Sequence, residues 1–112
     1  MATKEEVEEG LERVVAKYED LKSTWAFRRF NKTVQFMYPD LDLSFVLEIA
    51  GSEGVKEIKE GTVPRPNIVV KLDSDTFLAI LNKEINALDA YSAGKISFKG
   101  AMTDLLKLQR LL

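Results

Sequence analysis

The chain has 112 residues, of which 46% are hydrophobic and 30% are charged, a composition typical of one soluble globular domain with a single core. It contains no cysteine and no histidine, so disulfides, thiolate chemistry, Ser-His triads and the usual zinc sites cannot be built from it. The net charge of -2 argues against nucleic-acid binding, and we expect a single domain over residues 1–112 with no metal or other cofactor.

The first predicted element is a helix over residues 3–22. Thr3 and Glu6 have the spacing of a capping box at its start. Gly10 interrupts the helix at a cost of about 1 kcal/mol relative to alanine. Apolar residues recur at helical spacing and form one stripe, made of Val7, Leu11, Val14, Val15, Tyr18 and Leu21. The stripe indicates that the helix packs on the rest of the domain, and it does not indicate a function.

Residues 23–32 form an aromatic segment whose pattern fits neither a helix nor a strand clearly. Trp25, Phe27 and Phe30 are predicted to lie in or near the core. An aromatic gate to a cavity is the alternative interpretation.

Three or four strands are predicted next, and the candidate segments are residues 33–38, 43–50, 55–60 and 67–72. The residues predicted to face the core are Val34, Phe36, Leu43, Phe45, Leu47, Ile49, Ile68, Val70 and Leu72. The segment 55–60 is short and highly charged, which is typical of an edge strand. Turn signals separate the strands at Pro39-Asp40, at residues 51–54 and at residues 61–66.

Two helices follow the strands. Asp73 or Ser74 is predicted to cap the first, whose apolar residues are Phe77, Leu78, Ile80, Leu81 and Ile85. The second is short and runs from Leu88 to Ala93. Because a further strand and helix come after them, the element order implies an α+β domain with helices packed on one face of a sheet.

The final segment, residues 94–112, changes its period at Gly100. Before it, Ile96 and Phe98 alternate with polar residues, as in a half-buried strand. After it, helical spacing predicts a broad apolar face made of Ala101, Met102, Leu105, Leu106, Leu108 and Leu112, with Gln109 inside it. The opposite face holds Thr103, Asp104, Lys107 and Arg110, with Leu111 apart among them. The pattern alone favours a core helix, and a partner or a ligand could also cover this face.

Short motifs in this segment have a fixed order: Gly94-Lys95, Gly100-Ala101-Met102 and Lys107-Leu108-Gln109. They resemble the end of the sterol carrier protein type 2 lipid-binding domain. The resemblance extends upstream through Ala90-Tyr91, Phe77–Leu81 and Ile68–Leu72. The chain departs from the family at Lys83 (usually glycine), Ala87 (often proline), Ser92 (an aromatic) and Ala101 (an Asn or Asp cap).

The resemblance implies a five-stranded, mostly antiparallel or mixed sheet with helices on one face. It also implies an apolar tunnel between the two layers, closed by the last helix. The ligand would be a fatty acid, acyl-CoA, phospholipid or sterol-like lipid, bound without a covalent reaction. The residues expected to line the tunnel are Phe36, Phe45, Leu47, Phe77, Leu81, Phe98, Met102, Leu105, Leu106, Leu108, Gln109 and Leu112.

Two other classes of function are weighed against a lipid carrier. In an interaction or oligomerisation module, the last helix would pack on a partner. An enzyme would depend on paired carboxylates, and no carboxylate lies in a motif that demands catalysis. Gln109 has two interpretations as well. Either its amide satisfies a nearby backbone group or lies at the edge of the helix contact, or it is a polar contact for a ligand head group. The protein is expected to be a monomer or a homodimer.

The charge is distributed unevenly. Residues 1–22 hold four basic and seven acidic side chains, whereas residues 95–112 hold four basic residues and one acidic residue. The basic end is interpreted as a solvated helix face, or as a weak docking patch for transient contact with an anionic membrane. The chain has no signal-peptide pattern and no apolar run long enough to span a bilayer, so we expect a cytoplasmic protein.

Overall fold

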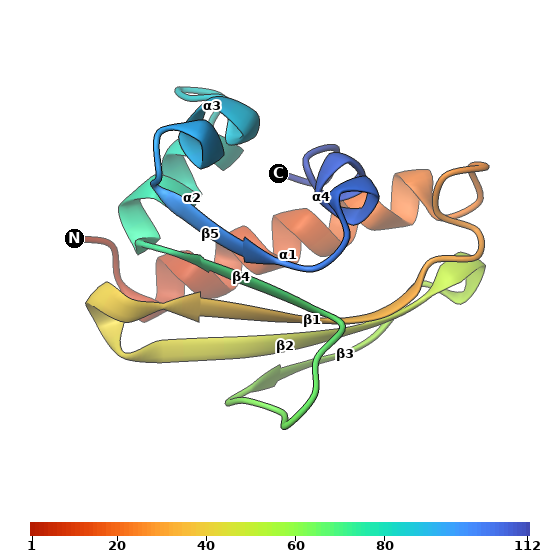
Figure 1. Cartoon of the computed structure of the whole chain (residues 1–112). Coiled ribbons are helices and arrows are strands. Elements are labelled where there is room, and N and C mark those ends of the chain that lie inside the picture. Colours follow the sequence, from red (N-terminus) through yellow and green to blue (C-terminus); the bar gives the residue numbers. More distant parts are fainter.

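The computed structural model describes residues 1–112 and contains five strands and four helices (Figure 1). The elements in chain order are α1 (Lys4–Leu21), β1 (Asn31–Tyr38), β2 (Leu43–Ala50), β3 (Val55–Glu60), β4 (Ile68–Leu72), α2 (Ser74–Leu81), α3 (Ala87–Ser92), β5 (Ile96–Lys99) and α4 (Met102–Leu108). The predicted order of elements is therefore confirmed. The capping box of Thr3 and Glu6 is also present. None of the helices is both long and apolar enough to cross a bilayer.

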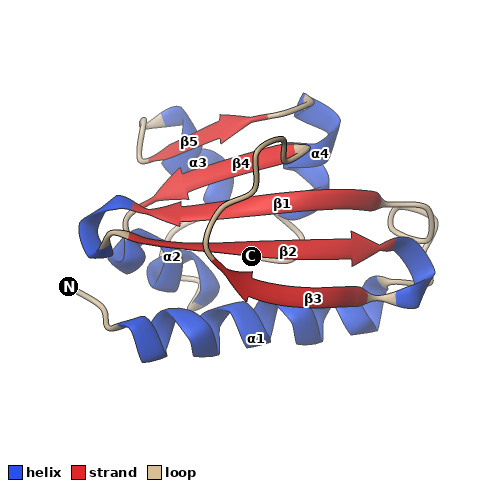
Figure 2. Cartoon of the chain, turned by 90° about the horizontal axis from the view of Figure 1, so that it is seen from below, coloured by secondary structure: helices blue, strands red, loops and turns tan.

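The five strands form one mixed sheet in the order β3-β2-β1-β4-β5. β1 and β4 are parallel, and the other neighbouring pairs are antiparallel. β3 is an edge strand, as its charged sequence predicts. The chain passes from β3 to β4 by a loop that crosses the open face of the sheet (Figure 2). Gln35 holds this loop, because its amide donates to the Gly61 oxygen at 2.9 Å and accepts from the Val63 N–H at 3.1 Å.

All four helices cover the other face of the sheet, and the core lies between the two layers (Figures 1 and 2). Every strand residue that was predicted to face the core is buried. Gly10 lies where α1 meets α2: a Cβ atom at this position would be 2.7 Å from Phe77 Cε2. The glycine is therefore required by the close approach of the two helices, in spite of its cost to helix stability.

The aromatic segment is only partly buried. Phe27 and Phe30 are in the core as predicted, and the Phe27 ring packs edge-to-face on Tyr18 with centroids 5.4 Å apart. The prediction for Trp25 is wrong, since this side chain is 83% exposed. The segment makes consecutive turns after α1. In these turns Phe27 and Phe30 face the core, whereas Trp25 faces solvent.

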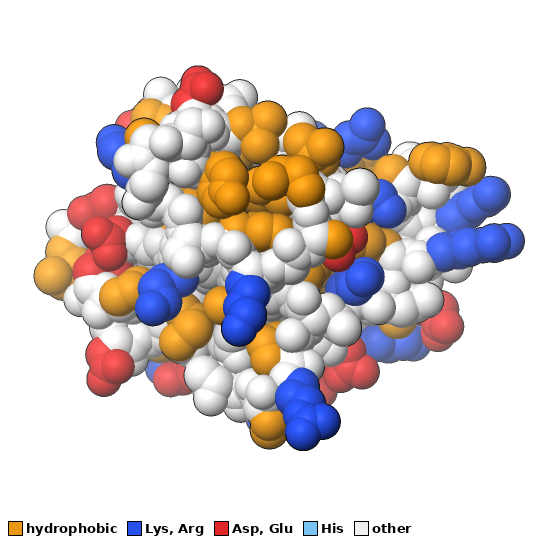
Figure 3. Space-filling view, viewed as in Figure 1, with side chains coloured by type: hydrophobic (Ala, Val, Ile, Leu, Met, Phe, Trp, Pro, Cys, Tyr) orange, Lys and Arg blue, Asp and Glu red, His pale blue; other side chains and the backbone are white.

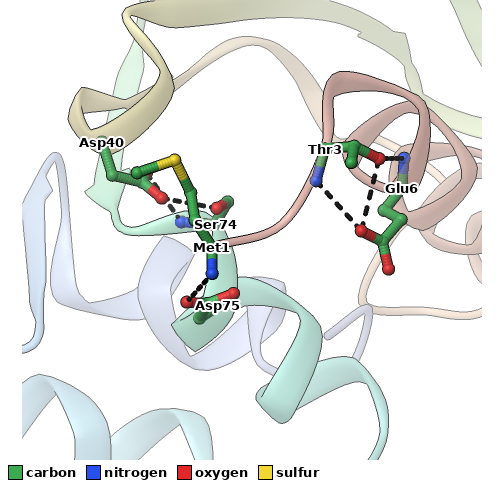
Figure 4. Close-up of polar contacts among 6 residues, drawn as sticks. All are labelled: Met1, Thr3, Glu6, Asp40, Ser74 and Asp75. Atoms are coloured by element: carbon green, nitrogen blue, oxygen red, sulfur yellow. Dashed lines mark hydrogen bonds and ion pairs between the residues drawn. The ribbon is translucent and has the colours of Figure 1, made fainter.

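A carboxylate from another part of the chain caps the start of α2 (Figure 4). Asp73 is the N-cap residue, but its side chain makes no capping hydrogen bond. Instead, the Asp40 carboxylate accepts from the Ser74 N–H at 2.9 Å and from the Ser74 hydroxyl. Burial alone would raise the pKa of Asp40, but the hydrogen bonds from Ser74 outweigh burial and hold this pKa below its ordinary value of 3.8.

Asp40→Ala should therefore destabilise the protein in a pH-dependent way. The folded-state pKa of Asp40 lies below the unfolded-state value of about 3.9, so its carboxylate stabilises the fold at neutral pH. This contribution is lost as the pH falls through the folded-state pKa. We expect a loss of about 1–2 kcal/mol at neutral pH, as for other helix caps, and a smaller loss near pH ~2.

Urea unfolding of Asp40→Ala at several pH values measures this effect. Asp73→Ala is the matched control, because it removes a carboxylate at the same helix start that makes no capping hydrogen bond. Equal losses in the two variants, or a loss from Asp40→Ala that does not depend on pH, would contradict the capping role of Asp40.

Candidate functional site

α4 and the turn that follows it lie over the helix-bearing face of the sheet and close a small apolar cavity. We call it the inner cavity; it is lined by Val14, Val34, Phe36, Leu47, Ile49, Leu108, Leu111 and Leu112. All eight side chains are buried. The volume of the cavity is about 10 Å³, which is the space of one water-sized sphere. The last residues of the chain therefore fill most of the space between α1, the sheet and α4.

A second, open pocket lies next to the inner cavity, where α2 and α3 meet the end of the chain. This outer pocket has a volume of about 290 Å³ and is lined by Ile80, Lys83, Glu84, Ile85, Asn86, Ala87, Gln109 and Leu112. Leu112 belongs to both linings. Leu112 therefore adjoins both the outer pocket, which has charged and amide side chains, and the wholly apolar inner cavity.

Lys83 fixes Leu112 in this position. Its Nζ donates a hydrogen bond to the main-chain oxygen of Leu112 at 2.7 Å. Lys83 has a φ of 63°, in the left-handed region that favours glycine, which is the residue usually found here in the family that the sequence resembles. A non-glycine residue in this region costs roughly 1–2 kcal/mol. The strained backbone places the Lys83 ammonium group at the outer pocket.

Gln109 is half-buried and lines the outer pocket beside Leu112. Its backbone ends α4, and its side-chain amide makes no hydrogen bond within the protein. The part of the first interpretation in which the Gln109 amide satisfies a backbone group is therefore wrong. The side chain offers a free donor and a free acceptor at the pocket.

The residues predicted to line a tunnel lie in several places. Phe36, Leu47, Leu108 and Leu112 line the inner cavity, and Gln109 lines the outer pocket. Phe45, Phe77, Leu81 and Leu105 are buried but do not line the inner cavity. Phe98 is half-buried on β5; it pairs with Val70 and faces the helices. Hydrophobic side chains gather above β5 between α3 and α4 (Figure 3).

The predicted apolar face of the last helix needs a correction. Met102 is 55% and Leu106 is 44% exposed, whereas Asp104 is only 6% exposed. The Asp104 carboxylate faces inward because it forms an ion pair with Lys32 at 3.4 Å. α4 ends at Leu108, so helical spacing does not continue to Leu112, and the turn after it buries Leu111.

The inner cavity also has residues that the sequence analysis did not assign to a site. Val14 and Ile49 were predicted only to face the core, and Leu111 was placed away from it. Lys83 carried a signal, because it replaces a glycine of the family that the sequence resembles. That signal pointed to an unusual backbone conformation and did not point to the contact with Leu112.

The hydroxyl oxygen of Tyr38 is buried and has no hydrogen-bond partner. It is the one such side-chain atom in this structure. Burial raises the pKa of this hydroxyl well above its ordinary value of about 10, so it remains a neutral donor. Its ring is stacked against Phe36, a residue of the inner cavity, and packs edge-to-face on Phe77. An unsatisfied buried hydroxyl costs about 1–3 kcal/mol, which a bound polar group would relieve.

Comparison with known proteins gives one family and several similar structures. A model of the SCP-2 sterol transfer family matches residues 11–112. The solution structure of palmitated SCP2L2 from Aedes aegypti is 20% identical with a TM-score of 0.68, and the match covers 94% of this chain and 92% of that protein. Sterol carrier protein-2 like-3 from the same organism is 18% identical with a TM-score of 0.67, over 96% of this chain and 95% of that one. No match is found among curated proteins.

The fold also occurs inside a larger enzyme. The sec-alkylsulfatase Pisa1 from Pseudomonas sp. is 18% identical with a TM-score of 0.63 over 90% of this chain. The present chain spans only 14% of the length of that sulfatase. At this identity the likeness shows a shared fold, a mixed five-stranded sheet with helices on one face.

Proposed function

The chain belongs to the SCP-2 sterol transfer family, and from this premise we propose that it binds a single-chain amphiphile such as a fatty acid without catalysing a reaction on it. The observation that carries the proposal is the position of Leu112 between an apolar inner cavity and a polar outer pocket. In this arrangement the hydrocarbon chain enters the inner cavity and the head group stays in the outer pocket. The palmitated relative, which shares the fold, supports a ligand of this class.

Binding requires the end of the chain to move. The inner cavity of about 10 Å³ is far smaller than the roughly 300–1,000 Å³ of typical ligand sites. We call residues 102–112 the lid, because Leu108, Leu111 and Leu112 fill the space that the hydrocarbon would take. When the lid shifts, its leucines lose buried apolar area. Burial of the ligand's apolar surface compensates for this loss, at about 25 cal/mol per Å² of buried area.

The outer pocket suits an anionic head group. When the lid opens, the Lys83 ammonium group loses the Leu112 oxygen and becomes free to donate to a carboxylate. The free amide of Gln109 supplies a second donor from the lid itself. Glu84 lines the same pocket, and its negative charge opposes an anionic head group, so the carboxylate of the ligand would lie on the side of Lys83 and Gln109. A fatty acid carboxylate meets these requirements with one polar group and one chain.

The lining of the inner cavity supports the non-catalytic part of the proposal. Its eight side chains are Val, Leu, Ile and Phe, which provide no acid, base or nucleophile. The polar residues of the outer pocket would act by holding a head group in place.

The alternative is an interaction or oligomerisation module without bound lipid. Organic extraction of the natively purified protein, followed by mass spectrometry, separates the two functions when it is combined with light scattering. We expect a lipid in near-stoichiometric amount. A lipid-free protein that forms a stable dimer would favour the module.

Gln109→Leu should weaken the binding of palmitate by about five- to tenfold, since a hydrogen bond to a ligand contributes about 1–1.5 kcal/mol. The same change should leave the affinity for a hydrocarbon of equal length unchanged or slightly higher, because leucine places an apolar side chain of similar size at this position. Competition against a fluorescent fatty acid measures both affinities. Equal losses for the two ligands would show that Gln109 does not contact the head group.

A further inference from the structure

We propose that a surface beside the lid docks on a bilayer that contains anionic phospholipids. The surface, which we call the docking patch, consists of Trp25, Leu106, Lys107 and Arg110, which line one hollow, together with the exposed Arg28 and Arg29, which follow Trp25 in the turns after α1. It combines the turn after α1 with the outer side of α4. It shares no residue with the inner cavity or the outer pocket, so it is independent of the proposed ligand site.

The two parts of the docking patch meet at a shallow hollow of about 390 Å³. Trp25 is 83% exposed on one side of it, and Leu106 is 44% exposed on the other. Lys107 and Arg110 line the same hollow. A tryptophan suits the boundary between lipid head groups and hydrocarbon, because its ring is apolar and its N–H is polar. Exposure of such a side chain in water is otherwise unfavourable.

The charges around Trp25 select an anionic partner. Residues 22–32 contain four basic side chains and no acidic one. Residues 99–112 contain three basic side chains and Asp104, whose carboxylate is buried and paired with Lys32. Lys22 forms an ion pair with Glu19 and Lys32 forms one with Asp104, whereas the basic side chains of the docking patch, Arg28, Arg29, Lys107 and Arg110, form none. Lys and Arg side chains lie next to the exposed hydrophobic group at the right-hand end of the molecule (Figure 3).

The opposite charge of α1 gives the contact an orientation. Residues 1–21 hold seven acidic and three basic side chains, so an anionic bilayer repels this helix. A symmetric contact between the docking patches of two copies of the chain is unfavourable, since two basic patches repel each other. A bilayer also fits the position of the patch, because Leu106, Lys107 and Arg110 belong to the lid; this last point rests on the proposed function.

Trp25 is the only tryptophan of the chain, so its fluorescence reports the docking patch directly. We expect its emission to shift to the blue when vesicles of phosphatidylcholine and phosphatidylserine are added, and to remain unchanged with vesicles of phosphatidylcholine alone. Arg28→Gln combined with Arg29→Gln should weaken binding to the mixed vesicles by roughly 25-fold, or about fivefold for each basic residue removed. The matched control is Lys56→Gln with Lys59→Gln on β3, which removes the same charge from exposed positions outside the patch and should change the affinity much less.

Three results would overturn the proposal. The first is an unchanged Trp25 spectrum with the mixed vesicles. The second is equal loss of binding in the two double variants, which would mean that only the total charge matters. The third is a blue shift that appears with rising protein concentration and no vesicles, which would assign the patch to a second copy of the chain.

Discussion

Leu108→Ala should lower the free energy of unfolding by about 2–5 kcal/mol in the absence of lipid, and saturating palmitate should recover much of this loss. Leu108 is 4% exposed and lines the inner cavity, so its removal enlarges the space that the proposed hydrocarbon chain occupies. In the native protein, palmitate must first displace the packed lid. In the variant part of that space is already empty, so we expect tighter binding.

The stability that palmitate should restore can be calculated from its concentration. A ligand at 100 times its dissociation constant adds about 2.7 kcal/mol to the free energy of unfolding. Leu72→Ala is the matched control: Leu72 is 2% exposed and belongs to the core, but it does not line the inner cavity. Urea unfolding with and without palmitate should show similar losses for the two variants and a larger recovery for Leu108→Ala. Equal recovery in both would place the ligand elsewhere.

Palmitate should also slow amide hydrogen exchange in the lid by up to roughly 100-fold, the factor that corresponds to 2.7 kcal/mol. In the free protein, we expect the lid to open without unfolding of the sheet, since α4 has only seven residues and lacks a side-chain cap at Ala101. Its amides should then exchange faster than those of β1. Bound palmitate removes this local opening, because its hydrocarbon chain beneath Leu108 holds the lid in place.

The amides on the exposed side of α1 are the internal control for this experiment. They exchange by local fluctuations that a ligand in the inner cavity does not block, so their rates should change little. The lid would be an ordinary core element if its amides exchanged as slowly as those of β1 in the free protein. Protection that increased equally along the whole chain would lead to the same conclusion.

The fold could be predicted from the sequence because its signals are local and repeated. Each alternating run, such as Leu43 to Ile49, specifies which residues face the core, and a shift by one residue would expose all of them. The capping box at Thr3 and Glu6 is equally local. The parallel pairing of β1 with β4 and the crossing loop held by Gln35 depend on contacts between distant segments, which periodicity does not report.

The predictions for the site succeeded less well, for two physical reasons. Helical spacing assigns a face only while the helix continues, and α4 ends at Leu108, so Leu111 is buried against expectation. An ion pair can also outweigh the apolar pattern, as it does for Asp104 with Lys32. Leu112, which adjoins both cavities, accepts a hydrogen bond from Lys83, 29 residues earlier in the chain. No one-dimensional pattern predicts such a contact.

The location of the ligand is the central claim, and isotope-filtered nuclear Overhauser spectroscopy tests it most directly. The protein would carry labelled methyl groups, and the palmitate would be unlabelled. We predict contacts from the palmitate chain to the methyl groups of Val34, Leu108 and Leu111, which line the inner cavity from β1, α4 and the turn after it. Contacts confined to the exposed Met102 and Leu106, or no contacts at all, would contradict a chain bound beneath the lid.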